Sequence, residues 1–291
     1  MSVLDVVLDG LMRRYTERVP DVYTVVSALV EHGLVETPQG IQNDHIAFRT
    51  LGLPLLGIQS LERVFLHYGY TKQDPFTFPV KNLDAFWYSP PHPKYPRIFI
   101  SELRVHELSD TVQAIIKKYA SEVLEDPTLN LYLDNPSVVD TFLHSPLWST
   151  PTWEEFEHVQ AESEYAAWVL YNRYYLNHFT ISVHTLPELV NTIPKFNQFV
   201  EMLGVRLNTA GGKVKVSQDG LLVQSSSVSQ LIDAPFPHKD GSEQRHKISG
   251  SYVEFAERKL KPGSIERRDG FDSGNADSIF ESTYSTQTNS P

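Results

Sequence analysis

The chain of 291 residues contains no cysteine. A chain without thiols forms no disulfide bond, has no thiolate nucleophile, and cannot hold zinc or an iron–sulfur cluster through sulfur ligands. Any bound metal must therefore be held by nitrogen and oxygen atoms. The 11 histidines and 36 acidic residues supply many such ligands.

Long apolar runs are also absent. No stretch of about 18 apolar residues occurs, so we expect no membrane-spanning helix. The first ten residues, Met-Ser-Val-Leu-Asp-Val-Val-Leu-Asp-Gly, are interrupted by acids and lack the basic region that precedes the apolar part of a secretory signal. The sequence therefore predicts a cytoplasmic protein.

Basic residues are fewer than acidic residues. The chain has 25 basic and 36 acidic residues, which gives a formal net charge of −11. Such a surface repels phosphate backbones and anionic lipids, so we expect neither nucleic acid nor a membrane as a partner. Apolar residues make up 41% of the chain, enough to build a buried core.

The strand pattern repeats once along the chain. Alternating apolar residues predict strands, and longer-period stripes and caps predict helices. The first block has strands at 41–50, 76–80, 84–89 and 97–105, with a helix at 58–68. The second has strands at 177–184, 213–217, 220–226 and 248–257, with a helix from a Thr185/Glu188 capping box to about Gly204. Both blocks have the order βαβββ.

Helices surround these two blocks. We expect residues 3–34 to be helical, with Pro20 as a break, one stripe on Val3, Val7, Leu11 and Tyr15 and another on Tyr23, Val26, Leu29 and Val30. Further helices are predicted at 109–123 and from a Thr152/Glu155 capping box to about Tyr171, while the last ten residues are expected to fray.

The expected fold class is α+β, with a curled mixed or antiparallel β-sheet built from two βαβββ-like modules. We expect one catalytic domain, 1–291, and divide it by the order of these elements. Its parts are N-terminal helices at 1–36, a first β module at 40–107, a helical insert at 108–175, a second β module at 176–260 and a C-terminal tail at 261–291.

Three predicted strands carry metal-ligating side chains on the face opposite their apolar residues. Because strand residues alternate sides, His45 shares a face with Arg49, while His178 and Glu254 each lie on the polar face of their own strand. Two histidines and one carboxylate can form a facial triad, which suits Fe(II) and, less specifically, Mn(II) or Zn(II). By residue type alone, His184, His246 and Glu257 are equally available.

Two simpler interpretations remain open at this point. The polar faces can belong to an ordinary antiparallel sheet with one side in water. Arg49 can form a surface salt bridge, or it can hold the far carboxylate of a small dicarboxylate whose other end is on the metal.

Six segments together resemble one known family, the 2-oxoadipate dioxygenase/decarboxylases, also called hydroxyglutarate synthases. The resemblance runs from about residue 5 to 284, with the motifs in the family's order, and the family is itself similar to the vicinal oxygen chelate superfamily. The segments are Asn43–Thr50, Pro96–Leu103, Asn177–Val183, Gly220–Ser227, Tyr252–Arg258 and Arg267–Thr283.

The resemblance implies an Fe(II) enzyme of lysine catabolism that converts 2-oxoadipate and O₂ to 2-hydroxyglutarate and CO₂. Its motifs assign His45, His178 and Glu254 as metal ligands and Arg49 as the substrate-binding residue. We also expect Gln224 and Ser226 to face the substrate. The alternatives are an enzyme of the same scaffold acting on a different 2-oxo acid, or a non-catalytic ligand-binding protein. The oligomeric state is left open.

Overall fold

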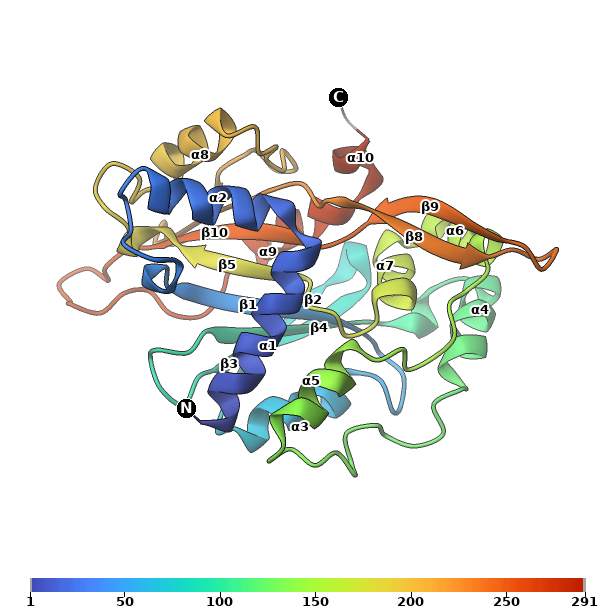
Figure 1. Ribbon diagram of the computed structural model, residues 1–291. Helices are drawn as coiled ribbons and strands as arrows, with labels where there is room; N and C mark the ends of the chain where they lie inside the picture. The colour runs from blue at the N-terminus through green and yellow to red at the C-terminus, as the bar shows by residue number, and fades with distance from the viewer. Residues whose placement is uncertain (1, 290–291) are drawn as a thin grey trace.

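A single mixed sheet of eight strands runs through the centre of the molecule (Figure 1). The computed structural model describes residues 2–289. Strand order across the sheet is β2-β3-β4-β1-β5-β10-β7-β6. The bounds are β1 Asn43–Leu51, β2 Thr71–Phe78, β3 Leu83–Ser89, β4 Arg97–Leu103, β5 His178–Ser182, β6 Lys215–Val216, β7 Leu222–Ser226 and β10 Tyr252–Arg258.

The sheet consists of two halves with the same topology. In the first half β1 pairs in parallel with β4, and in the second β5 pairs in parallel with β10. The two halves meet where β1 and β5 pair antiparallel. Each half has one helix after its first strand, which confirms the two predicted βαβββ modules. The continuity of the sheet supports our proposal that the chain forms one domain.

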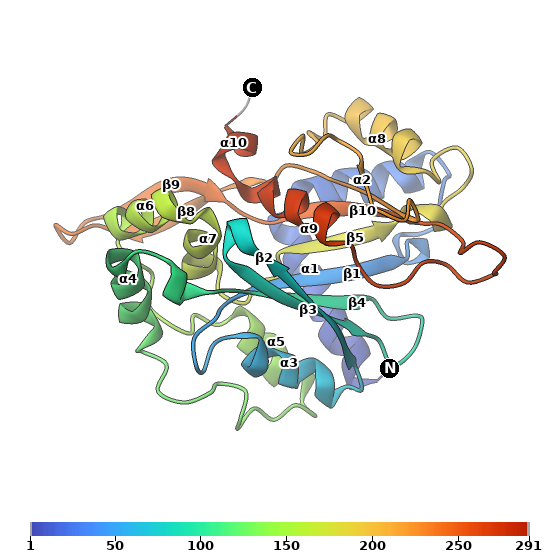
Figure 2. The same cartoon turned by 180° about the vertical axis from the view of Figure 1, so that it is seen from behind.

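Helices cover both faces of the sheet (Figures 1 and 2). They are α1 Val3–Arg18, α2 Pro20–Glu31, α3 Ile58–His67, α4 Asp110–Ala120, α5 Pro136–His144, α6 Trp153–Glu162, α7 Glu164–Asn172, α8 Ile193–Met202, α9 Ser273–Phe280 and α10 Ser285–Thr288. Short 3-10 turns include η2 Pro79–Lys81, η4 Val183–Thr185 and η5 Glu281–Thr283.

One face of the sheet carries a continuous apolar core. Ile46 and Phe48 of β1 lie in it, as does Phe255 of β10, packed beneath α1, α2, α3, α5 and α8. The predicted stripe on α1 is buried there except for the partly buried Val3, whereas the stripe predicted on α2 was correct only in part, at Leu29 and the partly buried Val26. The buried residues of α2 are Val22, Val25, Ala28 and Leu29, while the predicted Tyr23 is 68% exposed.

The opposite face carries a second core and, at its centre, the polar residues discussed below. Ala47 of β1 and Phe99 of β4 pack there against α4, α6, α7 and the segment around α9. A hairpin formed by β8 Leu231–Pro237 and β9 Glu243–Ser249 also lies on this side. The sequence analysis missed this hairpin, and the strand predicted at 248–257 divides between the end of β9 and β10.

Two helix boundaries differ from the predictions. The helix predicted from Thr152 to about Tyr171 is interrupted at Ser163, which caps α7. The Thr185/Glu188 capping box was wrong, since the Thr185 hydroxyl donates to the Ser182 carbonyl within η4. The helix begins only at Ile193, with Pro194 in its first turn, where proline's missing N–H is not needed.

The tail was expected to fray over its last ten residues, and this was wrong for the described part. Ser282, Thr283 and Thr288 are buried, and η5 and α10 continue the chain after α9. In Figure 2, α9 lies in front of the sheet, and it contacts β2, β6 and β7. Residues 290 and 291 lie outside the described residues.

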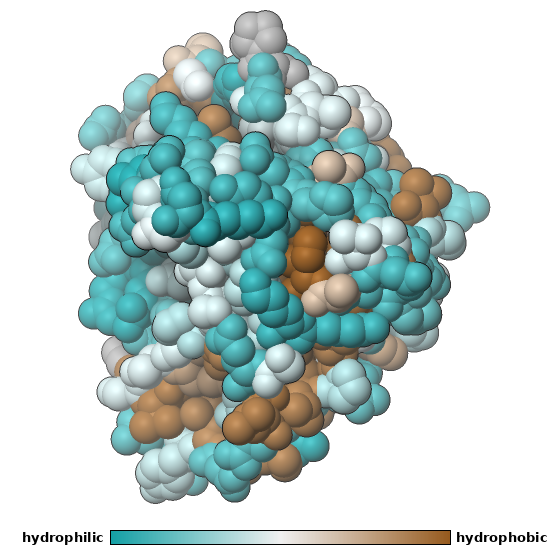
Figure 3. All heavy atoms as spheres, turned by 90° about the vertical axis from the view of Figure 1, so that its right-hand side faces the viewer, coloured by the Kyte–Doolittle hydropathy of each residue, from teal (hydrophilic) through white to brown (hydrophobic). Residues whose placement is uncertain are grey.

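The face seen in Figure 3 is largely hydrophilic, with apolar atoms gathered in its lower part and in a hollow between polar ones. Within residues 2–289, no helix combines the length and the apolar character needed to cross a membrane.

Candidate active site

The two central strands and their neighbour bring together the three predicted metal ligands. His45 is on β1, His178 on β5 and Glu254 on β10, which are adjacent in the sheet. Nε2 of His45 lies 3.5 Å from Oε1 of Glu254, and Nε2 of His178 lies 3.1 Å from Oε2. The two Nε2 atoms are 3.4 Å apart. All three residues are at least 90% buried.

Each histidine is oriented by the residue before it. Nδ1 of His45 lies 2.9 Å from the Asp44 carboxylate, and Nδ1 of His178 lies 3.0 Å from the side-chain oxygen of Asn177. These oxygens accept the Nδ1 proton, so each Nε2 lone pair points toward Glu254. Such outer partners fix ring orientation and tautomer at metal sites.

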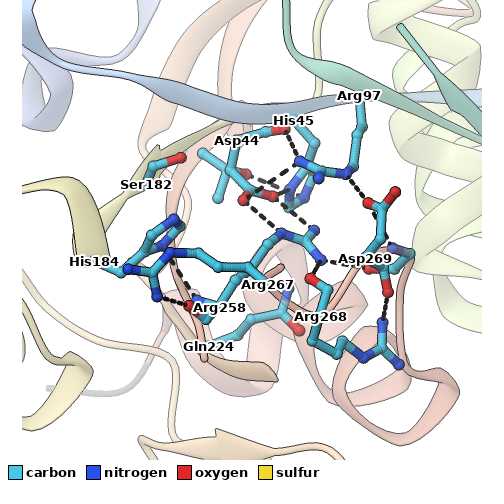
Figure 4. A network of polar contacts seen from close by, with 12 residues as sticks. Asp44, His45, Arg97, Ser182, His184, Gln224, Arg258, Arg267, Arg268 and Asp269 are labelled. Carbon is cyan, nitrogen blue, oxygen red and sulfur yellow. Dashed lines mark hydrogen bonds and ion pairs between the residues drawn. The ribbon is translucent and has the colours of Figure 1, made fainter. Parts of the chain in front are cut away.

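Asp44 is held in turn by a buried arginine (Figure 4). Arg258 donates from Nε and Nη2 to the two Asp44 oxygens, at 2.7 and 2.8 Å. Its Nη1 donates to the carbonyls of Gly270 and Arg268, in the loop before α9. Burial alone would raise the pKa of Asp44, but Arg258 and His45 outweigh it and hold the pKa well below its ordinary value.

The two histidines have opposite electrostatic surroundings. Burial disfavours the charged form of both rings. For His178 this lowers the pKa well below its ordinary value, with His45 and Arg49 adding to the shift. For His45 the Glu254 and Asp44 carboxylates outweigh burial and raise the pKa.

The cluster has the composition and spacing of a divalent metal site. One ligand atom from each of the three residues lies within 4.8 Å of the others. Imidazole and carboxylate donors bind a divalent first-row metal and leave further coordination positions open. The Glu254 carboxylate is buried against the Nε2 atoms of His45 and His178. The Nδ1 atoms of both histidines are already hydrogen-bonded, so a cation fits between the three residues. The residues present therefore fit the group that the sequence predicted.

Gln224 and Ser226, expected to face a substrate, have different environments. Gln224 of β7 lines the cavity beside the cluster, and its side-chain nitrogen donates to Oε1 of Glu254 at 2.5 Å. The side-chain oxygen of Gln224 accepts from Asn275 of α9. Ser226 is fully buried, and its hydroxyl lies 2.9 Å from that of Ser282. Ser226 is thus behind the tail and not among the residues that line the cavity.

Arg49 lies on the wall of the same cavity as the histidines and Glu254. Its side chain is 1% exposed, which excludes a surface salt bridge. Nη1 donates to the Thr283 hydroxyl and Nη2 to the Phe280 carbonyl, both in the tail. Its guanidinium carbon lies 5.0 Å from the ring centre of Tyr165 and 5.3 Å from that of Trp168. Within residues 2–289 no carboxylate forms an ion pair with Arg49, so its charge is available to an anionic ligand.

The cavity between the cluster and Arg49 is narrow and lies under the tail. Its volume is about 20 Å³, which is room for roughly one water molecule. Its other walls are largely apolar. The apolar lining comes from Ala47, Phe48, Phe99, Phe271, Ala276, Ile279 and Phe280.

The other candidate ligands lie elsewhere. His184 is in η4, beyond the end of β5, where its Nδ1 accepts from the Arg258 backbone and burial lowers its pKa to about 4. Glu257 points to the opposite face of β10 and accepts from the Ile193 backbone at the start of α8. His246 is on β9 and stacks on Trp153, with ring centres 3.7 Å apart.

Several residues of the site were missed from the sequence. Asp44 and Asn177 were available, because an Asx residue precedes both histidines. Phe271 and Phe280 of the tail were not, since their position depends on how the tail crosses the sheet. Phe271 lies edge-on to His45, with ring centres 4.7 Å apart.

Two βαβββ modules joined in one curled sheet, with a candidate metal cluster on the central strands, define a fold of the vicinal oxygen chelate type. A Ralstonia eutropha protein assigned to the glyoxalase superfamily shares this fold at a TM-score of 0.75 and 18% identity, over 94% of this chain and 88% of that one. The chain belongs to the 2-oxoadipate dioxygenase/decarboxylase family, whose profile matches residues 7–264.

Two relatives have high similarity over most of the chain. The chloroplastic 2-oxoadipate dioxygenase/decarboxylase of Arabidopsis thaliana is 44% identical over 265 residues, which cover 84% of this chain and 68% of that protein. The crystal structure of the Oryza sativa hydroxyglutarate synthase in complex with 2-oxoadipate matches at a TM-score of 0.85 and 39% identity, over 98% of this chain and 93% of that one.

Proposed function

We propose that this protein is an Fe(II)-dependent dioxygenase/decarboxylase that converts 2-oxoadipate and O₂ to 2-hydroxyglutarate and CO₂, as a step of lysine catabolism. The observation that carries the proposal is that a buried His45–His178–Glu254 cluster lines one cavity with a buried Arg49, which pairs with no carboxylate within residues 2–289. A dicarboxylic 2-oxo acid has a 2-oxo acid group for the metal cluster and a second carboxylate for Arg49. The names of the family and of its relatives support this substrate.

The residues divide the task between them. His45, His178 and Glu254 would hold the iron, which supplies Lewis acidity and the activation of O₂. Arg49 binds the distal carboxylate and so places the 2-oxo acid group at the other end of the cavity. Gln224 holds the Glu254 carboxylate through its hydrogen bond. The apolar walls exclude water from the reacting groups.

Substrate entry requires the cavity to widen, because a volume of about 20 Å³ is far smaller than a six-carbon dicarboxylate. The tail from α9 to η5 forms one wall and carries the groups that bond to Arg49. We propose that this segment moves outward to admit the substrate and returns over it.

The test uses purified protein loaded anaerobically with Fe(II). We expect oxygen uptake, CO₂ release and 2-hydroxyglutarate formation in equal amounts with 2-oxoadipate, and much slower turnover with 2-oxoglutarate. Arg49→Ala should raise the substrate concentration required, since a buried charge-assisted pair is lost. Turnover without oxygen consumption would favour another reaction on the same scaffold, and absence of metal binding would favour a non-catalytic role.

The names of the Arabidopsis thaliana and Oryza sativa relatives describe those proteins as chloroplastic. For this chain a cytoplasmic location remains our prediction, and cell fractionation tests it.

A further inference from the structure

The walls of the cavity contain polar hydrogens that no protein atom accepts. Within residues 2–289, six buried side-chain nitrogen or oxygen atoms have no hydrogen-bond partner. Three of the six belong to residues that line the cavity, namely Nε of Arg49, Nδ2 of Asn177 and the hydroxyl of Tyr252. All three can donate a hydrogen bond. A buried donor without a partner costs free energy, so this concentration points to a ligand rich in acceptors.

Tyr252 is the residue of this group to which nothing above gives a role. It is fully buried on β10, two residues before Glu254 and on the same face of the strand. Its ring lies against His178, with centres 4.8 Å apart. The side chain thus lies between the metal cluster and the Arg49 end of the cavity.

The Tyr252 hydroxyl is surrounded by the Arg49 guanidinium, the Glu254 carboxylate and the Ser282 hydroxyl. Burial raises the pKa of Tyr252 and outweighs the nearby Arg49 guanidinium, which lowers it; the Glu254 carboxylate adds to the rise and the Ser282 hydroxyl opposes it. Ser282 already bonds to Asn208 and Ser226, and Arg49 has only donors to offer. The Tyr252 hydroxyl and Nε of Arg49 therefore belong to the wall of one cavity, and within residues 2–289 neither atom has a hydrogen-bond partner.

We propose that Tyr252 is a specificity-determining residue, whose hydroxyl joins Nε of Arg49 in binding the distal carboxylate of a dicarboxylic 2-oxo acid. This inference rests on the proposed function and adds a second donor to the recognition of that carboxylate. A carboxylate oxygen accepts from both groups at once. A 2-oxo acid with a methyl group in that place would leave both donors unpaired.

The test compares two ligands of equal length, 2-oxoadipate and 2-oxohexanoate, which lacks the distal carboxylate. Dissociation constants are measured calorimetrically under anaerobic conditions with Fe(II)-loaded protein. Tyr252→Phe should weaken 2-oxoadipate binding about 10- to 100-fold, as expected for a hydrogen bond to a charged group. Binding of 2-oxohexanoate should change less than about twofold. In turnover, KM should rise for 2-oxoadipate with little change in kcat.

A matched control removes another buried tyrosine hydroxyl. Tyr174 is 1% exposed and donates to the Leu56 carbonyl, away from the cavity. Tyr174→Phe should lower the melting temperature and leave both dissociation constants unchanged. Without ligand, Tyr252→Phe should melt at the same temperature as wild type or higher, because no atom in the described part of the chain is hydrogen-bonded to the Tyr252 hydroxyl.

The outcomes separate the two proposals. Equal weakening of both ligands, or unchanged binding of 2-oxoadipate, in Tyr252→Phe would overturn the role of Tyr252 and leave the proposed function standing. A wild-type protein that binds 2-oxoadipate but consumes no oxygen would overturn the function and leave the role of Tyr252 standing. A drop in melting temperature as large as that of Tyr174→Phe would identify the hydroxyl as structural.

Discussion

Asp44 and Arg258 form a two-pronged ion pair that crosses over β5 and joins the two modules of the sheet. Their side chains are 1% and 2% exposed, and the shorter contact is 2.7 Å. Asp44 also receives the Nδ1 proton of His45, while Arg258 bonds to Gly270 at the start of the tail. One ion pair therefore connects a candidate metal ligand with the segment that closes the cavity (Figure 4).

Asp44→Asn should weaken both the fold and the metal site. Removing one charge of a buried pair leaves the other uncompensated, which costs about 3–5 kcal/mol. Loss of the carboxylate beside His45 should weaken metal binding about 10- to 100-fold. Urea unfolding and metal titration measure the two effects. Asp233→Asn is the control, because its pair with Arg245 is 58% exposed on both sides and solvent screening leaves such a pair little effect on stability.

His184 should make the protein less stable in mild acid. Its pKa is about 4 in the folded chain against an ordinary value of 6.5, because burial disfavours the charged ring. Between these values the unfolded chain binds more protons, so stability is complete above pH 6.5 and falls as the pH drops toward 4. Allowing for partial exposure, we expect a loss of about 1–2 kcal/mol.

The variant His184→Asn keeps an acceptor for the Arg258 backbone but cannot titrate. Unfolding free energies measured from pH 7 to 4 should therefore fall less steeply than in wild type, and metal affinity should not change. An unchanged slope would show that other groups govern the acid sensitivity.

The sequence was sufficient to predict which face of each central strand carries the candidate metal ligands. Alternation in β1, β5 and β10 correctly placed His45, His178 and Glu254 on one side of the sheet, and the family motifs selected them over His184, His246 and Glu257. His184 shows the limit of alternation, since β5 ends at Ser182 and the next residues turn into η4.

Asp44 shows a second limit. Strict alternation puts it on the face opposite His45, yet its side chain reaches Arg258. The pairing of β1 with β5 shifts register between Asn43 and Ile46, and such a bulge re-aims a side chain. The burial of the tail was not predicted for a related reason. It depends on contacts with Arg49 and Asn208, which lie on a strand and a loop far away in the sequence.

Metal binding should depend on His178 and not on His246. Removing one of three ligands should weaken binding of Fe(II), or of Zn(II) as a redox-stable probe, by at least about 100-fold in His178→Ala. His246→Ala removes a histidine of the β8–β9 hairpin and should bind as wild type does. Equilibrium dialysis with metal analysis measures both. Equal loss in the two variants would contradict the assignment.

Lys81 should control how easily the tail opens. Its ammonium group in η2 lies 2.9 Å from Asp277 and 3.0 Å from Glu281, in α9 and η5, and its side chain is 9% exposed. Lys81→Ala should remove about 1 kcal/mol of local stability and speed amide hydrogen exchange in residues 273–283 roughly fivefold. Lys213→Ala, which breaks an exposed pair with Glu201, serves as the control and should leave this exchange unchanged.

In wild type, 2-oxoadipate bound under anaerobic conditions should slow exchange in the same segment, because the ligand fills the space beneath it. Exchange that is the same with and without ligand would mean that the tail is not the wall that moves.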